Sequence, residues 1–156
     1  QKNDIDLITS RRIEQLLDTI RNAAYAAKEI KDIRQDLSYI QQSDNLFMFN
    51  TYKMLQLQVQ SFYSQASDLF NPHNETVLIE NFCLLKKEQQ KHKDEITRVI
   101  YQESRRQKLS DHDLSTLLNM VAEVALSHTL LLRGVQSYLF KNESSRVLAS
   151  AIWREN

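Results

Sequence analysis

The sequence predicts an all-α protein, an up-and-down antiparallel helical bundle of four long helices followed by a short C-terminal helix. The first observation is the scarcity of helix-breaking residues. The 156 residues contain only Gly134 and Pro72, where an average chain would hold roughly 11 glycines and 8 prolines. Hairpin turns and phosphate-binding loops need glycine, which excludes most sheet-rich and nucleotide-binding folds. The other two observations are long apolar seams at helical spacing and the short polar links between them.

The first segment carries a seam whose members recur every three or four residues. These members are Ile13, Leu16, Ile20, Ala23, Ala27, Ile30, Ile33, Leu37 and Ile40. The spacing is typical of coiled-coil-like helices, with a stammer of two successive three-residue gaps near Ile30. Asp4 or Asp6 is placed to start the helix, and a polar stretch after Ile40 ends it. We therefore expect one long helix with its seam in the core.

The second segment repeats the seam from Met48 to Leu69 and stops before Pro72, because the residue before a proline is pushed out of the α region. The third segment starts at Asn74, a good N-cap residue. Its seam continues to Val99 through a polar middle. Both segments are long enough to span the bundle.

The fourth segment opens at Ser110, with Asp113 three residues on, a capping-box pattern that uses Asp in place of Glu or Gln. Its seam runs from Leu114 to Leu139, and Gly134 lies inside it, where a glycine would permit close approach of another helix. A break near Asn142 precedes a short last segment. We therefore divide the chain into a bundle over residues 1–141 and a C-terminal helix over residues 142–156, which packs on the bundle or leaves it.

Charge and cysteine content narrow the function. Twenty Lys and Arg balance twenty Asp and Glu, so no overall field favours nucleic acid. The lone Cys83 forms no internal disulfide, has no histidine within reach of a nucleophile–base pair, and favours a reducing compartment. The longest apolar run, 23–27, is far shorter than the roughly 20 residues of a membrane span. We expect no enzymatic activity and no membrane span, and the missing initial methionine suggests a piece of a longer protein.

Glu29, Asp32 and Asp36 lie on one stripe of the first helix, beside its seam. Three carboxylates there could bind a divalent cation such as iron or zinc with help from a neighbouring helix. The alternative is a solvated acidic face that pairs with nearby lysines and arginines. His92 and His128 occupy seam positions at heights within roughly 6 Å of each other, counted from the link between their helices. They are either metal ligands in a layer with Glu29 or a polar layer that fixes helix register.

Two stretches carry a family resemblance. Residues Arg21 to Leu37 read RNAAYAAKEIKDIRQDL, and residues Leu114 to Phe140 read LSTLLNMVAEVALSHTLLLRGVQSYLF. The first resembles the first helix, and the second the last bundle helix, of the PhoU-like domain at the C-terminus of bacterial sodium/phosphate cotransporters.

The resemblance implies a cytoplasmic domain of an inner or plasma membrane protein that regulates or assembles a sodium-dependent phosphate transporter. Its partner would be the transmembrane portion of the same polypeptide. PhoU relatives bind metal clusters through a Glu/Asp-x-x-x-Asp motif, and Asp32 with Asp36 stands in that pattern, one turn after Glu29. The fourth helix shows no matching acidic pair, so one chain offers only half of such a ligand set. A metal site shared between the two chains of a homodimer remains an alternative.

Two other functions remain open. One is a metal-binding helical bundle that uses Glu29, Asp32, Asp36, His92 and His128. The other is a generic helical protein-interaction module whose long seams bind partner helices. An exposed apolar stripe on one helix would indicate the interaction module.

Overall fold

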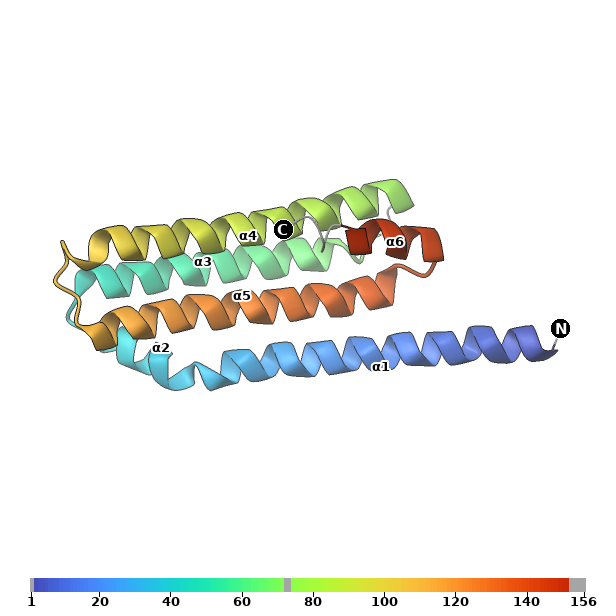
Figure 1. Cartoon of the computed structure of the whole chain (residues 1–156), viewed down its shortest axis with the longest axis horizontal. Helices are drawn as coiled ribbons and strands as arrows, with labels where there is room; N and C mark the ends of the chain where they lie inside the picture. Colours follow the sequence, from blue (N-terminus) through green and yellow to red (C-terminus); the bar gives the residue numbers. More distant parts are fainter. Residues whose placement is uncertain (1, 72–73, 152–156) are drawn as a thin grey trace.

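The computed structural model describes residues 2–71 and 74–151, and within these ranges it contains helices and no strands. Four long helices pack in a bundle and run alternately up and down (Figure 1). The elements are α1 (Lys2–Asp32), α2 (Arg34–Gln41), α3 (Leu46–Asp68), α4 (Glu75–Ser104), α5 (Asp111–Leu139) and α6 (Glu143–Ala151). The predicted all-α class and the four-helix bundle are confirmed, while Pro72 and residues 152–156 lie outside the described residues.

Capping side chains start three of the long helices. The Asn45 side chain accepts from the backbone N–H groups of the first turn of α3, and Asn74 does the same for α4. Ser110 and Asp113 form the predicted capping box of α5, in which each side chain accepts from the backbone of the other. These contacts satisfy N–H groups that have no partner inside the helix.

The apolar core consists of two clusters along the bundle. The cluster near α2 buries Ile33, Ile40, Met48, Leu55, Ile96, Ile100, Leu117, Met120, Val121 and Val124. The cluster near α6 buries Phe62, Ala66, Leu69, Phe82, Leu85, Leu132, Val135 and Phe140. Every member comes from residue 33 onward, so α1 contributes no buried side chain to either cluster.

Helix α5 is the centre of the fold, because α1, α2, α3 and α4 all pack on it. Its seam residues Val121, Leu132 and Val135 are buried as predicted. Leu117 and Val124, which lie outside the predicted seam, are buried as well. A single seam is too narrow for a helix that has neighbours on several sides.

The first predicted helix is two helices, since α1 ends at Asp32 and α2 begins at Arg34. The interruption falls at Ile33, one turn after the stammer expected near Ile30. Neither proline nor glycine is present there. After the break, Ile33 and Ile40 point into the core, where the seam places them.

Before the break, the predicted orientation is wrong. The seam from Ile13 to Ala27 faces solvent, whereas Ile30 packs against the core. Helix α1 packs along α5 with no comparable contact to α3 or α4 among the described residues (Figure 1). Helix α6 packs against α4. There the buried Ser145 hydroxyl donates to the carboxylate of Glu75, the first residue of α4.

Candidate functional site

Helix α1 lies against α5 through small and polar residues. A Cβ atom added at Gly134 would lie 3.2 Å from the backbone carbonyl oxygen of Thr19, which is tighter than an ordinary contact. The Thr19 hydroxyl donates to the carbonyls of Gln15 at 2.8 Å and of Gly134 at 3.3 Å. Two turns away, the buried Ser127 hydroxyl donates to the carbonyl of Ala26 at 2.8 Å. The glycine therefore permits the close helix approach predicted for it.

Polar side chains hold the rest of this interface. The Ser137 hydroxyl donates to the carboxylate of Asp18 at 2.5 Å. Arg12 donates to the carbonyl of Tyr138 at 3.2 Å, and its guanidinium carbon lies 5.2 Å from the centroid of that ring. Hydrogen bonds and close backbone contact, rather than large apolar side chains, attach α1 to α5.

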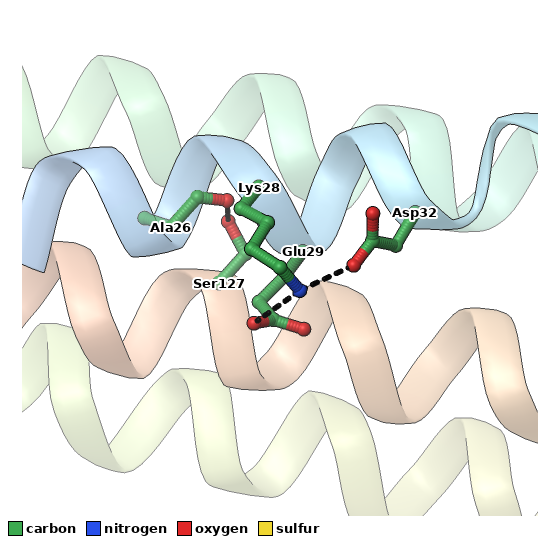
Figure 2. A network of polar contacts seen from close by, with 5 residues as sticks. All are labelled: Ala26, Lys28, Glu29, Asp32 and Ser127. Atoms are coloured by element: carbon green, nitrogen blue, oxygen red, sulfur yellow. Dashed lines mark hydrogen bonds and ion pairs between the residues drawn. The ribbon is translucent and has the colours of Figure 1, made fainter.

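Acidic side chains gather where the C-terminal part of α1 meets α5. The Lys28 amine lies 2.5 Å from the Asp32 carboxylate and 4.0 Å from that of Glu29, and Figure 2 shows it between the two. A hydrogen bond with Glu29, followed by burial, raises the pKa of Glu123 on α5. The Oε2 atom of Glu123 is buried without a hydrogen-bond partner. Glu123 on α5 thus faces the acidic end of α1, where Lys28 lies between Glu29 and Asp32.

Asp36, the acidic residue on α2, makes a separate contact with α5. Asp36 accepts a hydrogen bond of 2.6 Å from the side-chain amide of Asn119 on α5. Tyr39 donates to Asp113 at 2.8 Å, beside the cap of α5. Burial raises the pKa of Asp113, but hydrogen bonds from Ser110 and Tyr39 outweigh it and leave the pKa below its usual value. These contacts join α2 to the first turns of α5.

The five predicted metal ligands are distributed over several contacts. Glu29 and Asp32 surround Lys28, Asp36 contacts Asn119, and the Nδ1 atom of His92 is buried on α4 without a hydrogen-bond partner. Over residues 2–71 and 74–151, no three His, Cys, Asp or Glu side chains are grouped so that they could hold a metal ion. Metal binding by these residues stays a prediction.

His128 has the environment of a buried polar layer. Its ring stacks on Phe62 with centroids 3.8 Å apart, and Tyr63 meets it edge-on at 6.0 Å. Its Nδ1 atom lies 2.7 Å from the amide oxygen of Gln89 on α4, and its Nε2 atom has no hydrogen-bond partner. Burial lowers the pKa of His128 to about 4, so the ring is neutral at physiological pH.

Cys83 on α4 is partly buried. Burial raises the pKa of its thiol, against the smaller opposing effects of Lys87 and Lys86. A raised pKa reduces the thiolate fraction, which is the nucleophilic form.

The most distinctive surface is the outer side of α1, which we call the apolar face of α1. Its members are Ile13, Leu16, Leu17, Ile20, Ala23, Ala24 and Ala27, and all are exposed. The exposed fraction is 53% for Ile13, 54% for Leu17 and 65% for Ile20. At about 100° per residue, this face lies about 130° around the helix from the line that contacts α5. It is therefore open along its length within the described part of the chain.

An apolar cavity borders this face. It measures about 270 Å³ and lies over α5, between the middle of α1 and the end of α3. Ala23 lines it from α1 and Phe70 lines it after α3, with Leu131 and Tyr138 of α5 between them. The exposed rings of Phe70 and Tyr138 are 5.8 Å apart. The apolar surface of α1 thus continues across α5 toward α3.

One helix among the described residues, α5, is long and apolar enough to cross a membrane by length and composition, with a mean hydropathy of 1.3. It is also the helix on which the others pack, and a core helix of a soluble protein meets the same criterion. Comparisons of the chain with protein-family models, with curated proteins and with solved structures find no match.

Proposed function

We propose that this chain is a non-enzymatic helical interaction and assembly module that binds a partner helix on the apolar face of α1. The observation that supports this is the row of exposed Ile13, Leu16, Leu17 and Ile20 on a helix that is otherwise attached by polar contacts. Single exposed apolar side chains are ordinary, but contiguous rows mark interaction surfaces. Covering these half-exposed side chains would contribute about 1 kcal/mol each, or about 4 kcal/mol together.

A helix is the ligand that fits this surface. The exposed apolar residues recur every three or four positions along one helix. Anchor residues at this spacing are typical of contacts between an amphipathic helix and its partner. The adjacent cavity, bordered by Ala23 and Phe70, offers a place for side chains of the incoming helix.

A lipid surface fits less well. Helices that lie on membranes are rich in Lys and Arg on their polar side. Helix α1 carries six Lys or Arg and six Asp or Glu, so it has no net charge with which to attract anionic headgroups.

In-cell photo-crosslinking tests the module. A photoreactive residue at Ile20 should link to a helical segment, of this chain or of another protein, and Ile13→Lys should abolish the product. The matched control is a photoreactive residue at Leu57 on α3, which is 66% exposed, compared with 65% for Ile20. Equal labelling from both positions would contradict the proposal.

A more specific proposal is that the module is the PhoU-like cytoplasmic domain of a sodium-dependent phosphate transporter, with the transmembrane portion of the same polypeptide as partner. It rests on the resemblance of 21–37 and 114–140, and the first stretch lies largely on α1, which packs along α5. Deleting this domain from the parent protein should change phosphate uptake or its regulation. Unchanged uptake and unchanged regulation would rule the proposal out.

The metal-binding alternative keeps the predicted ligands, of which only Glu29 and Asp32 lie together, around Lys28. The full set is Glu29, Asp32, Asp36, His92 and His128. Metal analysis of the purified protein, with Asp32→Asn as control, tests it. Failure to retain zinc or iron at micromolar free metal would remove this alternative.

A further inference from the structure

We propose that the apolar face of α1 is covered by α1 of a second copy of this chain, which runs antiparallel to it. This inference rests on the interaction module proposed above and names its partner. It follows from the sizes of the exposed side chains, the charges at the two ends of the face, and the space around it.

The face is asymmetric in side-chain size. Its N-terminal half carries Ile13, Leu16, Leu17 and Ile20, and its C-terminal half carries only alanines. In an antiparallel pair in which Leu17 of one copy meets Ile20 of the partner subunit, Ile13 meets Ala24 of the partner subunit, so large side chains meet each other only at the centre of the contact. A parallel pair would place large side chains against large ones and leave alanines facing alanines across a gap.

The charges at the ends of the face favour the same orientation. Asp6 and Lys31 are exposed and lie in line with the apolar residues, because 25 positions at about 100° each return to nearly the same side of a helix. When Leu17 of one copy meets Ile20 of the partner subunit, Asp6 meets Lys31 of the partner subunit. The two-fold symmetry of the pair repeats this ion pair at the other end. A parallel pair would instead place like charges together.

The rest of the molecule leaves room for the second copy. Since the apolar face and the line that contacts α5 are about 130° apart around α1, the incoming helix does not compete with α5. The order of helices across the pair is then α5, α1, the partner's first helix and the partner's fifth.

The size of the contact sets the expected affinity. The distance from Asp6 to Lys31 along the helix is about 37 Å, and a helix with its side chains is about 10 Å wide. The strip is therefore roughly 400 Å² per copy, or roughly 800 Å² in total, which is smaller than a stable interface and fits a weak, reversible contact. Phe70 and Tyr138, exposed beside the cavity, extend the apolar surface beyond the strip. We expect a reversible dimer with a Kd of about 1–100 μM.

Analytical ultracentrifugation of the full chain from about 5 to 500 μM tests the dimer. The average mass of the wild-type chain should rise from 18.4 kDa toward twice that value. Leu17→Lys/Ile20→Lys should remain monomeric throughout, because it places lysines at the centre of the contact. Leu57→Lys, at an equally exposed leucine on α3, should associate like the wild type. Far-ultraviolet circular dichroism verifies that each variant is helical.

Charge reversal tests the orientation. Asp6→Lys and Lys31→Asp should each raise the dimer Kd about five-fold, and the double variant Asp6→Lys/Lys31→Asp should restore it. A double variant that stays as weak as the single ones would overturn the antiparallel arrangement.

Two results would overturn the second copy as partner: a wild-type chain that stays monomeric at 500 μM, or a Leu17→Lys/Ile20→Lys variant that dimerises normally. The proposed module would survive either result if in-cell crosslinks from Ile20 reach another protein. The proposed module itself would fail if photoreactive residues at Ile20 and Leu57 gave equal crosslinking.

Discussion

At the scale of single residues, His128 links stability to pH. Burial holds its pKa at about 4 in the folded protein, whereas an unfolded chain has a value near 6.5. Below pH 6.5 the unfolded state therefore binds more protons than the folded state, and the free energy of unfolding falls as the pH drops toward 4. Above pH 6.5 the ring is neutral in both states, and the free energy of unfolding is not reduced by this group. Below pH 4 the reduction reaches its full size of about 3 kcal/mol.

His128→Leu tests this linkage. We expect urea unfolding of the wild type to lose about 2–3 kcal/mol more than His128→Leu between pH 7.5 and pH 4.5. The control is His112→Asn, because His112 is exposed. Parallel pH profiles for the wild type and His128→Leu would show that the ring is not the titrating group.

Gly134 sets the distance between α1 and α5. Gly134→Leu should lower the free energy of unfolding by about 1–3 kcal/mol, because the added side chain meets the Thr19 backbone and forces the helices apart. Gly134→Ala is the matched control. Its gain in helix propensity of about 1 kcal/mol offsets the 3.2 Å contact, so its stability should remain near that of the wild type. Denaturant unfolding checks both variants, and a fully stable Gly134→Leu would contradict the close approach.

At the scale of elements, the sequence predicted where helices begin and end better than it predicted which helices pack against one another. Asn74 and Ser110 cap helices where their residue types indicate, since a cap needs only local contacts. The seam from Ile13 to Ile20 was assigned to the core and is exposed, because periodicity shows which residues share a face but not what covers it.

The contact between α1 and α5 was only partly foreseeable. Thr19, Asn22 and Ala26 recur at helical spacing but are small or polar, so a search for apolar residues passes over them. Gly134 was the available signal, since a glycine inside a long helix indicates close packing. Pairing it with Thr19 requires the tertiary structure.

The attachment of α1 predicts its dynamics. Because α1 adds no fully buried side chain to either core cluster, and only the partly buried Ile30 packs against one of them, it should open without unfolding the rest of the chain. Hydrogen exchange followed by mass spectrometry should show faster exchange over 6–20 than over 116–135 at about 5 μM protein. Equal protection of the two ranges would contradict this expectation.

At the scale of the whole molecule, the two clusters of buried residues form without α1, from which only the partly buried Ile30 packs against them. Every residue of both clusters lies at or beyond Ile33. A chain of residues 33–156 should therefore remain helical and unfold cooperatively, with lower stability because the α1 contacts of Ser127 and Gly134 are lost. Circular dichroism during thermal unfolding measures this. A shortened chain with no cooperative transition would show that α1 is part of the folding unit.

The first and fifth helices pack together although α1 ends at Asp32 and α5 begins only at Asp111. During synthesis at about 5–20 residues per second, α1 is made roughly 5–20 s before α5 is complete. For that interval the side of α1 that packs on α5 lacks this neighbour, and the apolar face of α1 is exposed as well. The nascent protein thus presents an unoccupied amphipathic helix to chaperones until α5 has been made.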